Sequence, residues 1–264
     1  VPRRTHYFFR LARKFCLGPR STAFLCHNMR IHLRLVAVFI LPLLGLKAQA
    51  PVDRGPTRLL RFPATNGHAI VFSYAGQLYT VAADGGTARR LTDGPGYAIF
   101  PRFSADGTQL AFTAQYDGNT EVYVMPATGG APKRLTTSAT LDRDDLADRM
   151  GPNNIVFGWR NTTPEVVFRS RARSFNPFIG HLSTVGLDGD LPSQVPVPRG
   201  GFVSYSPDDT KIAYNRIFRE FRTWKRYRGG MCDDLSVYDF ATKKTETLCT
   251  TVDQEIEPMW YGNN

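Results

Sequence analysis

Short apolar runs separated by polar turns dominate the chain from residue 66 onward, with almost no helical periodicity. The first two runs, AIVFSY (69–74) and QLYTVA (77–82), are β-branched and aromatic, and the turn ADGG (83–86) and ARRLT (88–92) follow them. Apolar runs of about four to eight residues bounded by Gly, Asp and Pro indicate β-strands. The pattern therefore predicts an all-β chain built from hairpins.

The same plan recurs along the chain. FPRFSADGTQLAFTA (100–114) and EVYVMPATGGAPKRLT (121–136) repeat it, so Leu91-Thr92 returns 44 residues later as Leu135-Thr136. A more degenerate third unit covers 151–198, a fourth covers 200–250, and VDQEIEPMWYGNN (252–264) resembles the opening of a fifth. These units predict the boundaries of successive four-stranded sheets.

A period of about 40–45 residues with four strands in each unit is typical of a β-propeller. Turn signals alone also fit a β-sandwich with strands every 8–12 residues or so. The long period and the RLT that recurs after Gly-Gly favour the propeller. About four blades and the start of a fifth do not close a ring, so we expect this chain to be the N-terminal part of a longer protein. An unclosed ring leaves a sheet edge open, and we expect the isolated domain to be marginally stable.

The net charge of +10 is concentrated in the first 50 residues. They hold nine of the 33 Lys and Arg residues and no Asp or Glu, which leaves 24 basic against 23 acidic residues in 51–264. From Met29 onward the order is Arg30 and Arg34, the apolar run LVAVFILPLLGL (35–46), and AQA ending at Ala50. This order predicts a cleaved signal peptide over 29–50 and a periplasmic, exported protein.

The leader divides the chain into three parts. Residues 1–28 contain no Met and are expected to precede the true start, so the propeller domain would occupy 51–264. An uncleaved membrane anchor is the weaker alternative, because a span needs about 20 apolar residues. We predict no membrane association after removal of the signal. The near-neutral mature chain lacks the positive field that nucleic acid requires.

Few residues of the mature chain could hold a metal or perform catalysis. Only His68 and His181 remain, no CxxC spacing occurs, and neither GxSxG nor a phosphate loop is found. We therefore expect no metal, no cofactor and no catalytic residue here. The acidic run LDRDDLAD (141–148) lacks the central Gly and closing Glu of a calcium loop. We interpret it as a solvated loop or short helical turn between blades.

The remaining cysteines, Cys232 and Cys249, flank a predicted hairpin with the turn ATKK (241–244). Pairing across that turn gives residue sums near 483–485, and the two cysteines sum to 481. They should thus lie nearly opposite each other on neighbouring strands, in an exported setting that permits disulfides. A disulfide and two buried thiols remain equally open at this point.

Residues 216–231, RIFREFRTWKRYRGGM, mix basic and aromatic side chains. Such a mixture suits a single-stranded nucleic-acid groove, but the neutral domain around it removes that support. Phe218, Phe221, Trp224 and Tyr227 recur every third residue, which suits an extended hairpin insertion packed against a neighbouring blade. The basic residues form either a solvated rim or the lining of a passage for peptide carboxylates. The passage residues would be Arg222, Lys225, Arg226 and Arg228.

Several longer strings resemble the N-terminal propeller of tricorn-type serine peptidases. They are DRMGPNNIVFGW (148–159), VFRSRARSFNPFIGHL (167–182), PVPRGGFVSYSPD (197–208) and FREFRTWKRYRGGM (218–231). The shorter GGTARRLT, FSADGTQLAF and GGAPKRLT resemble TolB-like repeats in general. The resemblance covers about 57–264 and implies a six-bladed propeller, followed in that family by a second propeller, a PDZ-like domain and a peptidase domain.

The resemblance implies a non-catalytic role for this chain. The family's catalytic serine and histidine, with a further serine and a glutamate, belong to the peptidase domain, and none of those positions lies in 1–264. The propellers of the family guide oligopeptides to or from a shared chamber and help to assemble it. The implied partners are oligopeptides, the other domains of the same peptidase and further subunits. A freestanding TolB-like protein-binding propeller is the alternative, and sequence beyond Asn264 would distinguish the two.

Overall fold

The computed structural model describes residues 58–139, 144–146, 151–176, 178–218, 220–221, 227–249 and 253–262. These residues all belong to one compact unit, Pro56–Asn264. The described part of the chain contains sixteen β-strands, and it has no helix that could span a membrane. The strands are β1 (Arg61–Thr65), β2 (Ala69–Tyr74), β3 (Gln77–Ala82), β4 (Gly85–Arg90), β5 (Ala98–Phe103), β6 (Gln109–Ala114), β7 (Glu121–Pro126), β8 (Lys133–Arg134), β9 (Asn154–Trp159), β10 (Glu165–Ser170), β11 (His181–Gly186), β12 (Ser193–Gln194), β13 (Val203–Tyr205), β14 (Lys211–Asn215), β15 (Leu235–Asp239) and β16 (Lys244–Thr247).

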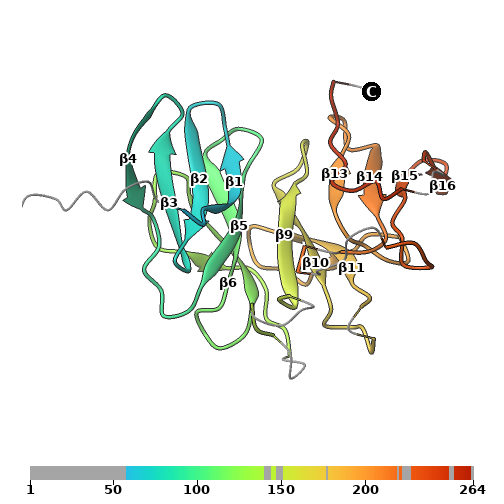
Figure 1. Ribbon diagram of the computed structural model, residues 1–264, viewed down its shortest axis with the longest axis horizontal. Coiled ribbons are helices and arrows are strands. Elements are labelled where there is room, and N and C mark those ends of the chain that lie inside the picture. Colours follow the sequence, from blue (N-terminus) through green and yellow to red (C-terminus); the bar gives the residue numbers. More distant parts are fainter. Residues whose placement is uncertain are drawn as a thin grey trace, which may run out of the picture. The chain divides into compact units, whose positions relative to one another are not determined.

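The strands form four antiparallel sheets of four strands each, and every sheet follows the order of the chain. We call them blades one (β1–β4), two (β5–β8), three (β9–β12) and four (β13–β16), and Figure 1 shows them in this sequence. The first strands lie together, since β5 contacts β1 and β9, and β9 also contacts β13. Repeated four-stranded meanders with their first strands adjacent are the architecture of a propeller. The predicted fold class is confirmed.

Both faces of blade two are buried because blades one and three pack on them. In β6, Leu110 and Phe112 pack with Val71 of blade one, whereas Ala111 packs with Val156 of blade three. Successive side chains of a strand point to opposite faces, so one strand serves two interfaces. Full burial of a Leu or Phe side chain contributes about 1.5–3 kcal/mol. The apolar runs of the sequence therefore stabilise blades in pairs rather than singly.

The recurring RLT motif ends blades one and two with the same hydrogen bonds. The Thr92 hydroxyl accepts from the backbone N–H of Leu78 at 2.9 Å, and the Thr136 hydroxyl accepts from that of Val122 at 2.9 Å. In each motif the arginine Nε donates to the carbonyl of the threonine, at 2.6 and 2.7 Å. The motif closes each blade because its threonine satisfies an N–H on the third strand that the fourth strand leaves unpaired.

The SADG and SPDD turns between the first two strands of blades two and four are also alike. The carboxylates of Asp106 and Asp208 each accept from the preceding serine hydroxyl, at 2.5 and 2.6 Å. The next residues adopt positive φ, +71° at Gly107 and +58° at Asp209, as such turns require. Asp209 replaces glycine because its carboxylate accepts from the Thr162 N–H and hydroxyl in blade three, at 2.8 and 2.6 Å.

Irregularities in the first strands occur at related positions. The register shifts around Phe62 in β1 and Phe100 in β5, and Phe157 is the extra residue at a shift in β9. Phe62 and Phe100 both have φ +53°, and each precedes a proline. Glu257 precedes Pro258 in the same way, with φ +60°. Bulges re-aim side chains, so these backbone features control which side chains face the centre of the propeller.

The start of the predicted fifth unit is attached to blade four. The indole N–H of Trp260 donates to the carbonyl of Ser204 at 2.9 Å, just as Trp159 of β9 donates to that of Arg102 in β5. Residues 253–262 contain no strand, but they occupy the place of a next first strand. Four blades and the start of a fifth are thus confirmed.

Candidate functional site

A cavity of about 860 Å³ lies between the first strands of the four blades. Its walls come from β1, β5, β9 and β13, together with the insertion between β14 and β15 and the start of the fifth unit. No single blade could form it, because its lining residues come from all four blades. The cavity is therefore a product of the propeller arrangement and is the candidate functional site.

Five phenylalanines line this cavity, Phe103 among them, and we call the other four, one from each blade, the phenylalanine collar. They are Phe62, Phe100, Phe157 and Phe202. The ring centroids of Phe62 and Phe100 are 4.0 Å apart, and those of Phe157 and Phe202 are 5.7 Å apart. Positive φ is uncommon for bulky residues, so the backbone at two collar positions is held in a costly conformation that presents the ring to the cavity.

The arginine-rich insertion contributes two rings to this aromatic cluster. The Phe218 centroid lies 5.5 Å from that of Phe157 and 5.1 Å from that of Phe202. The Phe221 centroid lies 6.0 Å from that of Phe100. We expected these rings to pack against a neighbouring blade, but they pack across the collar. The insertion therefore holds the collar residues of blades two, three and four together.

A glycine makes room for the insertion. Gly151 has φ +68°, and a Cβ atom at this position would overlap the ring of Phe221. Arg169, which is 1% exposed, places its guanidinium 5.4 Å from the centroid of Phe218. The aromatic cluster thus already holds one cation against a ring face.

Besides His68, Arg102 is the basic residue among the described side chains that line the cavity. Its Nε donates to the carbonyl of Phe157 and its Nη1 to that of Pro101, both at 2.9 Å. Burial lowers the pKa of Arg102, and the negative charges of Glu257 and Glu220 oppose that change. An arginine stays protonated in proteins, so this side chain joins β5 to β9 as a cation.

Three carboxylates line the same cavity and come from different parts of the chain. Asp106 lies in the turn after β5, Glu220 in the insertion and Glu257 in the fifth unit. Hydrogen bonds from Ser104 and Thr108 lower the pKa of Asp106 to about 2. Against one guanidinium, the described lining is negatively charged overall.

Of the four basic residues predicted to line a passage, the structure describes one, Arg228. Arg228 is exposed and is not among the residues that line the cavity. Arg222, Lys225 and Arg226 lie outside the described residues. Their role in a passage stays a prediction.

The predicted hairpin of blade four has the expected register. Ser236 pairs with Thr247 and Val237 with Glu246, which gives the residue sum of 483. Cys232 and Cys249 are both free thiols, and the Cys232 thiol donates to the Tyr227 carbonyl at 3.0 Å. A disulfide between them is absent from this structure and stays a prediction for the oxidised protein.

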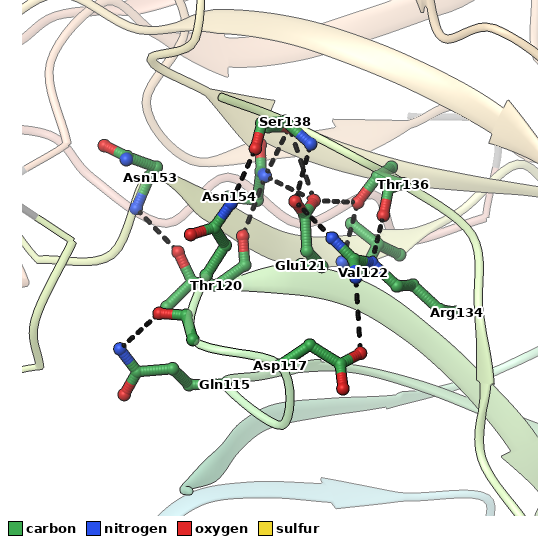
Figure 2. Close-up of polar contacts among 12 residues, drawn as sticks. Gln115, Asp117, Thr120, Glu121, Val122, Arg134, Thr136, Ser138, Asn153 and Asn154 are labelled. Atoms are coloured by element: carbon green, nitrogen blue, oxygen red, sulfur yellow. Dashed lines mark hydrogen bonds and ion pairs between the residues drawn. The ribbon is translucent and has the colours of Figure 1, made fainter. Parts of the chain in front are cut away.

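A buried carboxylate, that of Glu121 at the start of β7, joins blades two and three. Glu121, which is 0% exposed, accepts from Arg134 Nη2 at 3.1 Å and from the Thr136 hydroxyl at 2.5 Å. The Ser138 N–H, at 2.6 Å, and the Asn154 side-chain amide, at 3.0 Å, complete the shell. Figure 2 shows these donors converging on Glu121. A buried charge this well satisfied holds two blades in register.

Asp144 belongs to the acidic run that we expected to be solvated, but it is buried. Its carboxylate accepts from the Thr120 N–H, at 2.7 Å, from the Thr120 hydroxyl and from the Asn153 N–H, at 2.7 Å. It fixes the connection between blades two and three. Asp145 and Leu146 are the other described residues of this run, and no group of three His, Cys, Asp or Glu residues suited to a metal occurs among the residues described.

Asp233 is a second fully buried carboxylate, with fewer donors. It accepts from the backbone N–H groups of Arg216 and Ile217, at 2.9 and 3.1 Å, where the insertion leaves β14. Burial raises the pKa of Asp233 to about 7, although these hydrogen bonds act in the opposite direction. Its carboxyl group anchors the base of the insertion.

The cavity residues were not found from the sequence, although a signal for them is present. The dipeptides Phe62-Pro63 and Phe100-Pro101 stand at equivalent places in the first two repeats, and Glu257-Pro258 stands there in the fifth. A bulky residue before proline inside a predicted strand indicates a break in the ladder. Arg102 and Glu220 have no such signal.

Comparison with known proteins places this fold in a family. Residues 57–264 match the family described as the tricorn protease N-terminal beta propeller domain. Tricorn protease homolog 1 of Streptomyces coelicolor is 30% identical over 205 residues, which cover 77% of this chain and 18% of that protein. The tricorn protease of Thermoplasma volcanium is 26% identical over 178 residues, which cover 65% of this chain and 16% of that protein.

Solved structures show the same fold. The crystal structure of the tricorn protease aligns with a TM-score of 0.65 at 18% identity, covering 78% of this chain and 20% of that one. The chain spans about a fifth of the length of these relatives. The family match extends over nearly all of the part that forms blades, from before β1 to the end of the sequence. The chain belongs to the tricorn protease N-terminal β-propeller domain family.

Proposed function

We propose that this chain is the non-catalytic propeller portion of an exported tricorn-like serine peptidase, and that its central cavity is part of a passage for oligopeptides. The observation that carries the proposal is the cavity of about 860 Å³ between the first strands. Its walls offer phenylalanine rings and charged groups side by side. An extended peptide presents both apolar and polar groups, and such a mixed lining matches it.

The family match over residues 57–264 favours this role over a freestanding TolB-like binding module. The proposed partners are oligopeptides, the other domains of the same peptidase and further subunits. The catalytic serine would be supplied by another part of the full-length protein.

The passage can be narrowed by one substitution in the full-length peptidase. Ala64 on β1 lines the cavity, and Ala88 on the exposed strand β4 does not. We expect Ala64→Trp to lower kcat/KM for oligopeptides, increasingly so with peptide length, because a bulky side chain obstructs the path. Ala88→Trp introduces the same side chain outside the cavity and is expected to have no such effect.

Two controls separate obstruction from damage. Labelling of the catalytic serine with a fluorophosphonate reports whether the active site is intact in each variant. Circular dichroism reports whether the β-sheets are formed. Equal kcat/KM values for Ala64→Trp and Ala88→Trp at every peptide length would overturn the passage role.

Export is tested separately by fractionating cells that express the full-length gene. We expect the protein in the periplasmic fraction with Pro51 as its first residue, because AQA precedes that position. A cytoplasmic protein that retains residues 29–50 would contradict the proposal.

A further inference from the structure

The charge of the described cavity lining is opposite to the charge that the insertion suggests. The insertion is rich in arginine, but the described side chains lining the cavity include three carboxylates and one guanidinium. The carboxylates come from a turn, the insertion and the fifth unit, so they converge only in the folded domain. Low-dielectric walls strengthen the field inside such a cavity.

Structural hydrogen bonds hold the positively charged guanidinium of Arg102 in place. Two N–H groups of Arg102 are bound by the carbonyls of Phe157 and Pro101, which keeps the guanidinium against the wall between β5 and β9. A group that is held in this way is poorly placed to move toward an incoming anion. Among the described lining residues, carboxylates therefore outnumber the guanidinium that an entering peptide could meet.

Glu257 has a special position among the carboxylates. Like Phe62 and Phe100, it has positive φ and precedes a proline, and its N–H donates to Asn215 Oδ1 at 3.1 Å. Where the earlier units present a phenylalanine to the cavity, the fifth unit presents a carboxylate. The repeat thus replaces one ring of the phenylalanine collar with a negative charge.

Ring faces and carboxylates together favour one class of ligand. The face of an aromatic ring attracts cations through the negative charge of its π-system. A carboxylate beside such rings adds an ion pair and a hydrogen-bond acceptor. Peptide anions would instead meet Glu220, Glu257 and Asp106 as like charges.

We propose that the cavity binds the positively charged groups of oligopeptides, with the phenylalanine collar contacting the cation and Glu257 pairing with it. The ligand chemistry is an alkylammonium or guanidinium, which either a Lys or Arg side chain or the peptide α-ammonium could supply. This inference rests on the proposed passage and assigns it a substrate class. Glu257 is thereby a specificity-determining residue for peptides that pass through the cavity.

The test uses the full-length peptidase and two pairs of peptides of equal length. The first pair has acetylated N-termini and differs by Lys against norleucine at one position, which isolates the side-chain ammonium. The second pair differs by a free against an acetylated N-terminus, which isolates the α-ammonium. For each pair, kcat/KM is measured, and a fluorescent peptide gives Kd on protein whose catalytic serine has been blocked by a fluorophosphonate.

We expect the native protein to prefer the charged member of at least one pair. Glu257→Gln should reduce that preference by about three- to fivefold, as expected for a partly exposed ion pair. Glu257→Phe, which restores the residue of the earlier repeats, should reduce it as well while favouring apolar peptides. Glu246→Gln removes a carboxylate from the exposed strand β16 and should leave the preference unchanged.

The outcomes separate this inference from the passage itself. If Ala64→Trp obstructs peptides but Glu257→Gln leaves both charge preferences unchanged, the passage holds and the cation site is wrong. If Glu257→Gln weakens the binding of charged and neutral peptides equally, Glu257 acts only structurally and the inference is also wrong. If Ala64→Trp has no effect, the passage fails, and the peptide Kd values on blocked protein still decide whether the cation site exists.

Discussion

Blades one and two carry different side chains at the start of the third strand, and each side chain satisfies its hydrogen bonds in a different way. Gln77 begins β3 and Glu121 begins β7, and each accepts a hydrogen bond from the threonine of its RLT motif, at 2.8 and 2.5 Å. The neutral amide of Gln77 also donates to the carbonyls of Gly94 and Gly96, both at 3.1 Å. It thereby ties down the loop that leads to the next blade.

Glu121 cannot donate, and its surroundings are all donors. Arg134, Ser138 and Asn154 approach it in addition to the threonine, and Asn154 belongs to blade three. A charge without these donors would be costly to bury. The side chains of glutamine and glutamate differ by one amide NH2 group in place of one oxygen. This difference changes a hydrogen-bonded link to the next loop into a link between two blades. We therefore expect the two positions to respond unequally to mutation.

The largest effect is expected from Glu121→Ala. It leaves the guanidinium, amide and hydroxyl donors around Glu121 without an acceptor in a site that is 0% exposed at the carboxylate. Breaking a buried ion pair in this way costs about 3–5 kcal/mol. Hydrogen exchange of the β7 and β9 amides in the full-length protein measures the loss locally.

Glu121→Gln is the matched control for charge. It keeps one acceptor oxygen and the shape of the side chain, so we expect a smaller loss of protection than in Glu121→Ala. Equal losses in the two variants would show that the carboxylate charge accounts for the whole effect, and that neither the side-chain volume nor one remaining acceptor oxygen contributes.

Asp233 extends the comparison to a buried carboxylate that accepts hydrogen bonds from the backbone N–H groups of Arg216 and Ile217. Because its folded pKa is about 7 and its ordinary value is 3.8, both states are protonated at low pH. As the pH rises from about 4 through 7, the unfolded chain releases a proton that the folded domain retains, so stability falls. The expected loss is on the order of 4 kcal/mol over this interval.

Asp233→Asn removes this titration while keeping one acceptor oxygen. Urea-induced unfolding of the domain, followed between pH 4.5 and 8, should show the native protein losing stability relative to the variant as the pH rises. Other titrating groups cancel in the difference between the two curves. Parallel curves would show that Asp233 does not titrate in this interval.

A third change converts the chemistry of blade one into that of blade two. Gln77→Glu brings carboxylate oxygens against the carbonyls of Gly94 and Gly96 and supplies no guanidinium. Since Gln77 is half-buried, we expect a loss of about 1–2 kcal/mol at neutral pH. The measurement is exchange of the β3 amides, and Gln109→Glu at the start of β6 is the control for adding a charge. Equal effects of the two changes would mean that the local hydrogen bonds of Gln77 contribute nothing.

These comparisons also show what the sequence can predict. The repeat of Leu91-Thr92 as Leu135-Thr136 located the ends of blades one and two, because the Thr–backbone bond is local to one sheet. The hairpin of blade four was predicted to the correct register for the same reason. These two features, which depend on neighbours within about 20 residues, could be predicted from the sequence.

Features that depend on contacts with another blade could not be predicted from the sequence. Glu121 and Asn154 are 33 residues apart, and Arg102 meets Phe157 across 55 residues. Spacing along the chain has no relation to such contacts, since they depend on how two sheets pack. For Phe218 and Phe221, the step of three residues indicated an insertion but not its destination, because the collar residues that they contact come from three different blades.

The smallest expected difference separates the two RLT threonines themselves. Thr92→Val and Thr136→Val each leave one buried N–H, of Leu78 or Val122, without its acceptor, at a cost of about 1 kcal/mol. Thr136→Val should cost about 0.5–1 kcal/mol more, because the lost hydroxyl also donates to a carboxylate rather than to an amide oxygen. Valine keeps the shape of threonine, so exchange of the β3 and β7 amides compares the two hydrogen bonds directly. If the two variants lose equal protection, the charge on Glu121 adds nothing to the threonine bond, and the contrast between blades one and two lies entirely in Arg134 and Asn154.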